Sequence, residues 1–89
     1  MSILQMDKRT YLISTLTEMS DALDDEAMAV DIGKIKDTVA HAAPEILDNQ
    51  WMKIYRYCVT NVNDEANPNH LKCFLLYNKK YTEYKDKYL

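Results

Sequence analysis

The sequence is poor in the residues that make tight turns, with one glycine and two prolines among its 89 residues. A many-stranded β protein needs such residues between its strands, so their scarcity disfavours that class. Two cysteines and no recognisable signal peptide favour a reducing compartment, which predicts a cytoplasmic protein. No apolar run approaches the roughly 18 residues of a membrane span, so we expect no membrane partner.

The sequence also lacks the motifs of common enzymes. It has no glycine-rich phosphate loop, no nucleophile elbow and no supported Ser/His/Asp set. Cys58, Cys73, His41 and His70 are candidate metal ligands, but their spacing is not that of a zinc site. We therefore expect no catalytic activity, no cofactor and no metal, and two reduced cysteines packed in the core.

Charge is spread unevenly along what we expect to be a single domain, residues 1–89. Up to residue 48 there are ten acids against four bases, and from residue 49 there are four acids against seven bases. The halves therefore carry −6 and +3, within a net charge of −3 that argues against general nucleic-acid binding. This polarity can steer a partner, or a second copy of the chain, into register; chance clustering on a solvated surface is the alternative.

Four apolar stripes with the same +4, +3, +4 spacing predict four helices, at about residues 7–23, 26–42, 45–61 and 68–88. The expected core positions, helix by helix, are Leu12, Leu16, Met19 and Leu23; Met28, Ile32, Ile35, Val39 and Ala42; Leu47, Trp51, Ile54, Cys58 and Val62; and several aromatic residues after residue 68. Short connections favour antiparallel neighbours. The sequence thus predicts an all-α, compact four-helix bundle, antiparallel or irregular and orthogonal, with no sheet.

Local signals set the first two helix starts and leave one segment ambiguous. Asp7 or Ser2 can cap the first helix, and Asp24 or Asp25 can cap the second. The run from Tyr55 to Val62 is β-prone by composition, but no second strand-like run exists to pair with it. We therefore expect it to be helical.

The two prolines mark the other boundaries. Pro44 ends the second helix and can begin the third at its first position. Asn67 is the expected cap of the fourth helix, and Pro68 its first residue. If the last two helices are antiparallel about the loop near residue 65, Cys58 and Cys73 lie at the same level.

A helix-turn-helix element is a competing interpretation of the second helix. Ala29, Gly33 and Val39 match the loose Ala-x3-Gly-x5-Val pattern of that motif, but Lys34 stands where an apolar residue is usual. The would-be reading helix has no arginine for base contacts. If the motif is absent, Gly33 is expected to let two helices pack closely, since a helical glycine otherwise costs about 1 kcal/mol.

The final helix carries tyrosines that suggest a binding surface. Seven tyrosines against one phenylalanine is an unusual ratio, because a core that uses tyrosine must satisfy each hydroxyl. The apolar arc of this helix spans about 200°, wider than one core face requires. With Phe74 at its centre, Tyr81 and Tyr88 should point inward, and Tyr77 and Tyr84 should lie nearer the rim.

These observations favour a protein that acts by binding another protein. The expected type is an inhibitor, immunity, anti-defence or adaptor protein of the kind that phages and mobile elements encode, an analogy from size and composition. A small dimeric nucleic-acid-binding regulator, built around residues 29–39, is the alternative. The candidate partner-binding residues are Tyr77, Tyr84, Lys80, Asp21, Asp24, Asp25 and Glu26.

Overall fold

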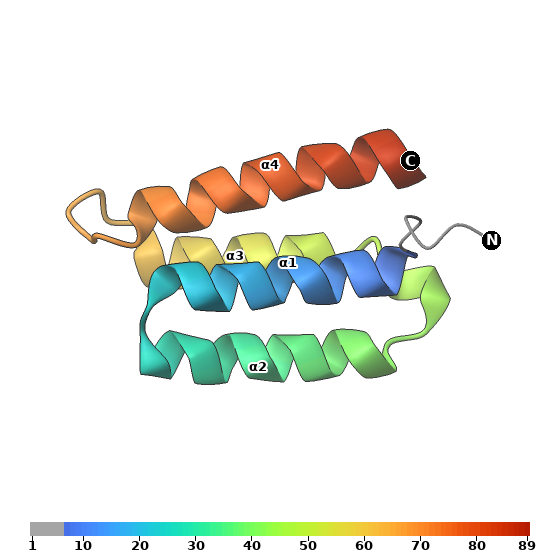
Figure 1. Ribbon diagram of the computed structural model, residues 1–89, viewed down its shortest axis with the longest axis horizontal. Coiled ribbons are helices and arrows are strands. Elements are labelled where there is room, and N and C mark those ends of the chain that lie inside the picture. Colours follow the sequence, from blue (N-terminus) through green and yellow to red (C-terminus); the bar gives the residue numbers. More distant parts are fainter. Residues whose placement is uncertain (1–6) are drawn as a thin grey trace.

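The chain folds into an antiparallel bundle of four helices (Figure 1). The computed structural model describes residues 7–89, and all structural statements below concern that part of the chain. Its elements are α1 (Lys8–Leu23), α2 (Glu26–His41), the short 3-10 helix η1 (Pro44–Ile46), α3 (Gln50–Val62) and α4 (His70–Tyr88). The described residues contain no strand, which confirms the all-α fold class.

The first two helices begin where the acidic capping residues predict. The Asp7 carboxylate accepts a hydrogen bond from the backbone N–H of Thr10, at 2.8 Å, and the Asp25 carboxylate accepts one from the N–H of Met28, at 3.0 Å. Each bond satisfies a backbone donor that a helix N-terminus leaves unpaired. Asp24 instead ends α1 in the left-handed region, at φ 50°. Ser2, the other candidate cap, lies outside the described residues.

The third helix starts later than expected, at Gln50 rather than at residue 45. Pro44 begins a 3-10 turn, in which the N–H groups of Ile46 and Leu47 bond to the carbonyls three residues earlier. This tighter turn lets the chain change direction between α2 and α3 while Leu47 stays buried. The ambiguous run from Tyr55 to Val62 is helical throughout, as expected.

The fourth helix also starts later than expected, at His70 rather than at Pro68. The Asn67 side chain accepts a hydrogen bond from the backbone N–H of Asn69, at 2.8 Å, and so closes a turn over the proline instead of capping a helix. Asparagine suits both roles, so sequence alone does not separate them.

Helix α1 packs against both α2 and α4, and α3 packs against α4. Arg9 joins α1 to the end of α2, since its guanidinium donates to the carbonyls of Val39 and Ala40 at 2.7 and 3.2 Å. The Val39 carbonyl also accepts a bond from the backbone N–H of Ala42, at 3.3 Å, so Arg9 adds to the cap of α2. Its positive charge also suits the negative end of the helix. Among residues 7–89, no helix is long and apolar enough to cross a membrane.

Nearly all the expected core positions are buried. The aliphatic stripe of α1 is at most 2% exposed, Ile32 and Val39 are buried in α2, and Ile35 is half-buried. Trp51, 1% exposed, forms the aromatic centre of the bundle. Its ring lies 5.0 to 6.4 Å, between centroids, from four tyrosine rings: Tyr11, Tyr77, Tyr81 and Tyr84.

The helix-turn-helix interpretation of residues 29–39 does not fit this fold. Helix α2 runs without a break through Gly33, where the motif requires a turn. The alternative role for this glycine, close helix packing, is also wrong. Gly33 is exposed, and a Cβ atom added to it would meet nothing within 4 Å.

Candidate protein-binding face

The expectation that Tyr77 and Tyr84 lie at the rim is wrong. Tyr84 is fully buried and Tyr77 is 8% exposed, whereas Tyr81 and Tyr88 are the half-buried members of the set. The apolar arc of α4 is centred on Phe74, but its core face consists of Cys73, Tyr77 and Tyr84, because α4 packs against α1 as well as α3. Burial leaves Tyr77 and Tyr84 little surface with which to contact a partner.

Three tyrosines place their rings in the bundle and their hydroxyls on carboxylates. Tyr11 in α1 donates to Glu83 in α4 at 2.6 Å, Tyr57 in α3 donates to Asp31 in α2 at 3.0 Å, and Tyr84 donates to Asp48. Each pair joins two elements. The first links α1 to α4, the second links α3 to α2, and the third links α4 to the connection between η1 and α3. The abundance of tyrosine is thus partly structural, because each hydroxyl satisfies an acid at the edge of the core.

These pairs shift the pKa values of the three phenols and of two carboxyl groups, Glu83 and Asp48. Burial, followed by the bond to the carboxylate, raises the pKa of the phenols of Tyr11, Tyr57 and Tyr84 above the usual 10.0. The Tyr84 hydroxyl, with help from Lys8, holds the pKa of Asp48 below 3.8. The Tyr11–Glu83 and Tyr84–Asp48 pairs therefore stay hydrogen-bonded, with a neutral phenol on an ionised carboxylate, across the neutral pH range.

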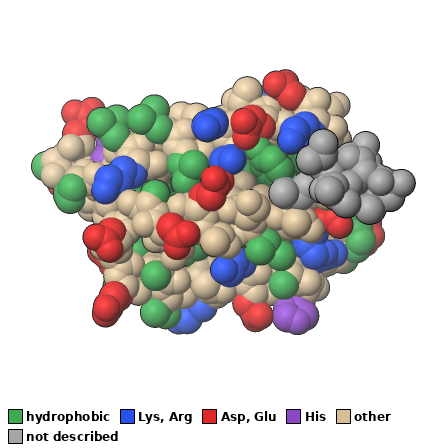
Figure 2. All heavy atoms as spheres, in the orientation of Figure 1, with side chains coloured by type: hydrophobic (Ala, Val, Ile, Leu, Met, Phe, Trp, Pro, Cys, Tyr) green, Lys and Arg blue, Asp and Glu red, His purple; other side chains and the backbone are tan. Residues whose placement is uncertain are grey.

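The remaining predicted site residues lie apart from Tyr77 and Tyr84. The Lys80 side chain is only 18% exposed and forms two ion pairs. Its ammonium lies 2.8 Å from Glu18 and 3.8 Å from Glu83. The four acids Asp21, Asp24, Asp25 and Glu26 are all exposed where α1 meets α2. Red carboxylates gather at this end of the molecule, at the lower left of Figure 2.

The acidic junction is explained in part by its structural roles. Asp25 caps α2, and Asp24 forms the left-handed link between the helices. Asp21 and Glu26 remain as exposed carboxylates. The seven predicted residues thus form no single surface: two are in the core, one is in an ion pair, and four lie at one end of the bundle.

The histidines and cysteines also have structural partners. His70 lies 2.6 Å from the Val62 carbonyl oxygen through Nδ1. Cys58 and Cys73 are both buried and reduced, and they contact each other at the same level of α3 and α4, as the sequence predicts. Their hydrogen bond, together with burial, raises the pKa of the Cys58 thiol. Within residues 7–89, no group of three or more His, Cys, Asp or Glu side chains is placed to hold a metal ion.

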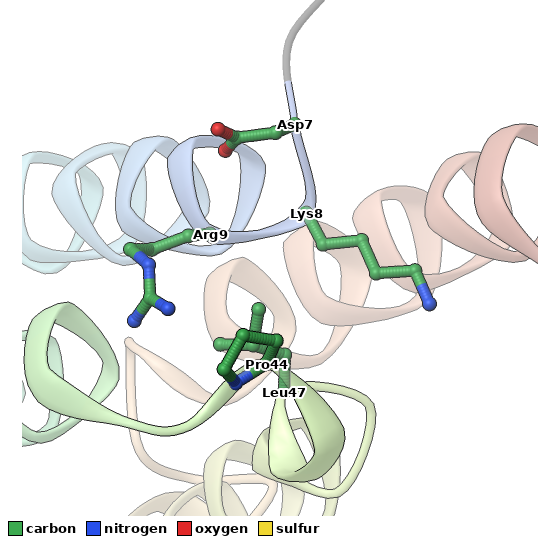
Figure 3. A pocket seen from close by; sticks show the side chains of 5 residues that line it. All are labelled: Asp7, Lys8, Arg9, Pro44 and Leu47. Atoms are coloured by element: carbon green, nitrogen blue, oxygen red, sulfur yellow. The ribbon is translucent and has the colours of Figure 1, made fainter.

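A hollow of about 370 Å³ lies at the opposite end from the acidic junction, between the start of α1 and the η1 turn. Its lining residues are Asp7, Lys8, Arg9, Pro44 and Leu47. Figure 3 shows Lys8 and Arg9 pointing to opposite sides of it. Both cations are already paired, Lys8 with Asp48 at 3.1 Å and Arg9 with the end of α2, so the hollow offers an anionic ligand no uncommitted charge.

Among residues 7–89, five of the eight large hydrophobic side chains that are exposed lie on α3 and α4. On α3, Met52, Tyr55 and Val59 are 54%, 42% and 37% exposed, and their +3, +4 spacing puts them on one helix face. On α4, Leu71 and Leu75 are 65% and 63% exposed at a spacing of +4.

Phe74 connects these two rows. Its ring is half-buried and lies 6.1 Å, between centroids, from that of Tyr55. With Cys58 beside Cys73 and the helices antiparallel, Val59 and Tyr55 lie at about the level of Leu71 and Leu75. We name this surface the α3–α4 apolar face, defined by Met52, Tyr55, Val59, Leu71, Phe74 and Leu75.

This face was not among the predicted binding residues, although two signals in the sequence pointed to it. The α3 sequence carries a second apolar row beside its core stripe, and the apolar arc of α4 is wider than a single core contact needs. Neither signal says which part of a wide arc faces the core, since that depends on where the neighbouring helices lie.

Comparisons with known proteins add no further information about this site. No protein-family model, no curated protein and no solved structure matches the chain.

Proposed function

We propose that this protein acts by binding another protein through the α3–α4 apolar face. The observation that carries the proposal is the set of five large apolar side chains, each at least 37% exposed, arranged in rows on two adjacent helices. Single exposed apolar residues are common on soluble proteins, but a contiguous patch of this kind is typical of an interaction surface.

We propose that it is an inhibitor, immunity or adaptor protein of the kind that phages and mobile elements encode. Its support is the small size of the domain together with a binding face made of rigid helices. Such a face loses little conformational entropy on binding and can cover a site on a larger protein.

Matched variants test the proposal. The change Leu71→Ser with Leu75→Ser removes the α4 row, and Val30→Ser is the control, because Val30 is 60% exposed on α2. Both variants should fold normally, since substitutions at such exposed positions usually change stability by no more than about 0.5 kcal/mol each.

The assay is capture of partners from a lysate of the cells that encode the chain, with circular dichroism as the check on folding. We expect the double variant to lose the captured partner, with affinity falling by about tenfold or more, and the Val30 variant to retain it. Equal capture by both variants would contradict the proposal.

A further inference from the structure

The exposed charged residues beside the two apolar rows on α3 and α4 are basic, whereas the loop between these helices carries two exposed acids, Asp64 and Glu65. Helix α3 contains Lys53 and Arg56 and no acidic residue. Arg56 lies one turn from both Met52 and Val59, and so borders the α3 row. It is itself exposed.

The α4 row is bordered in the same way. Lys72 and Lys79 are exposed and lie three residues before and four residues after Leu75, on its side of the helix. Of the two acids in α4, Glu83 is turned toward α1 by its bond to Tyr11, and Asp86 lies almost two turns beyond Lys79. The exposed apolar side chains thus lie between cations on both helices.

From this arrangement we infer that the α3–α4 apolar face takes an acidic amphipathic helix of the partner protein. A third helix can lay its apolar stripe along the exposed rows of two adjacent helices, with contacts at spacings of three and four residues. Acidic residues on the edges of that stripe would meet Arg56 on one side and the two lysines on the other. This inference rests on the proposed function and adds the chemistry of the partner.

The same charges disfavour the other occupants. A second copy that paired through the same face would bring cations against cations. Nucleic acid requires dense cationic contacts with phosphates, but this surface is mainly aliphatic, within a chain of net charge −3.

The test uses the full chain and a displayed library of random segments of about 14 residues, which reach about 21 Å as a helix and so span α3. We expect the selected segments to be amphipathic at helical spacing and enriched in Asp and Glu. Their affinity should fall as the salt concentration rises, because opposite charges at the edge of an interface are screened.

Charge reversal supplies the matched control. Arg56→Glu should weaken the selected segments by about tenfold, whereas Lys34→Glu, at an exposed position on α2, should leave their affinity unchanged. Both substitutions exchange one exposed cation for an acid on a helix, so a difference between them reports on the face and not on net charge.

The outcomes separate this inference from the proposed function. Selected segments that bind the apolar face without acidic enrichment, or no selected segment at all, would overturn the acidic-helix inference alone. If the Leu71→Ser, Leu75→Ser double variant still bound every selected segment, the result would also contradict the α3–α4 apolar face as the binding site. A dimer in light scattering that those substitutions dissociate, or an RNA or DNA complex on a low-salt gel, would identify a different occupant and overturn the inference.

Discussion

Replacing Gly33 with alanine should stabilise the protein. Gly33 lies in the middle of α2, has no positive φ, and faces open space. Alanine at such a position removes backbone freedom from the unfolded chain without a clash in the folded one. The helix propensities of the two residues differ by about 0.8 to 1 kcal/mol, and no packing contact is present to offset that gain.

Urea denaturation and thermal melting measure this effect. We expect the free energy of unfolding to rise by about 1 kcal/mol, and the midpoint temperature by about 4 to 8 °C for a domain of this size. Gly33→Leu should give nearly the same gain and Gly33→Thr a smaller one, because in open space only propensity distinguishes them. A loss of stability in the alanine variant would refute an exposed Gly33 within a continuous α2.

Two further predictions concern hydrogen bonds that join the helices, and a third concerns the buried phenols. Tyr84→Phe should destabilise the protein by about 1 kcal/mol and raise the pKa of Asp48 toward 3.8, measured by urea denaturation and by NMR titration; an unchanged pKa would exclude the bond. Arg9→Met should cost about 1 kcal/mol in the free energy of unfolding, because it keeps the aliphatic stem but removes the hydrogen bonds to the carbonyls of Val39 and Ala40; no change would contradict the cap. Burial raises the pKa of Tyr77 to about 12, and the pKa values of other core phenols shift the same way. The stability that these neutral phenols provide below pH 10 should therefore be lost as the pH rises through their folded-state pKa values. Melting temperatures that do not change above pH 10 would contradict this prediction.

Acid should also destabilise the bundle, because the pKa of Asp48 is lowered whereas those of the phenols are raised. The folded-state pKa of Asp48 lies below its unfolded value of 3.8, so its contribution is complete above that value and is lost as the pH falls through the folded pKa. In Tyr84→Phe this part of the acid dependence should shrink, which thermal melts below pH 4 can measure. An identical acid dependence in both proteins would argue against the pair.

The fold was predictable because its signals are local and repeated. The +4, +3, +4 stripes placed Leu12, Ile32, Trp51 and most other core residues correctly. The position of the loop alone predicted that Cys58 and Cys73 lie at the same level. The starts of α3 and α4 were less predictable. Pro44 and Asn67 fit a helix start as well as a turn, so the choice depends on tertiary packing.

The candidate site was less predictable than the fold. Because the apolar arc of α4 is wide, the helix could turn either side of it toward the core. Only the contacts with the two neighbouring helices, α1 and α3, fix which side is buried. Tyr77 and Tyr84 therefore lie in the core and not at the expected rim, while Leu71 and Leu75, on the far side of the same arc, are exposed. Tyrosine content pointed to binding, but a hydroxyl that bonds to a carboxylate satisfies the same need within the fold.

The most direct test of the binding face is site-specific photo-crosslinking in the cells that encode the chain. A photoreactive amino acid replaces Val59 on α3 in one variant and Val30 on α2 in the other, two exposed valines on different helices. The account predicts a discrete higher-mass adduct from position 59 and none from position 30. An adduct from position 30 alone, or from neither position, would contradict the assignment of the α3–α4 apolar face as the site where a partner binds.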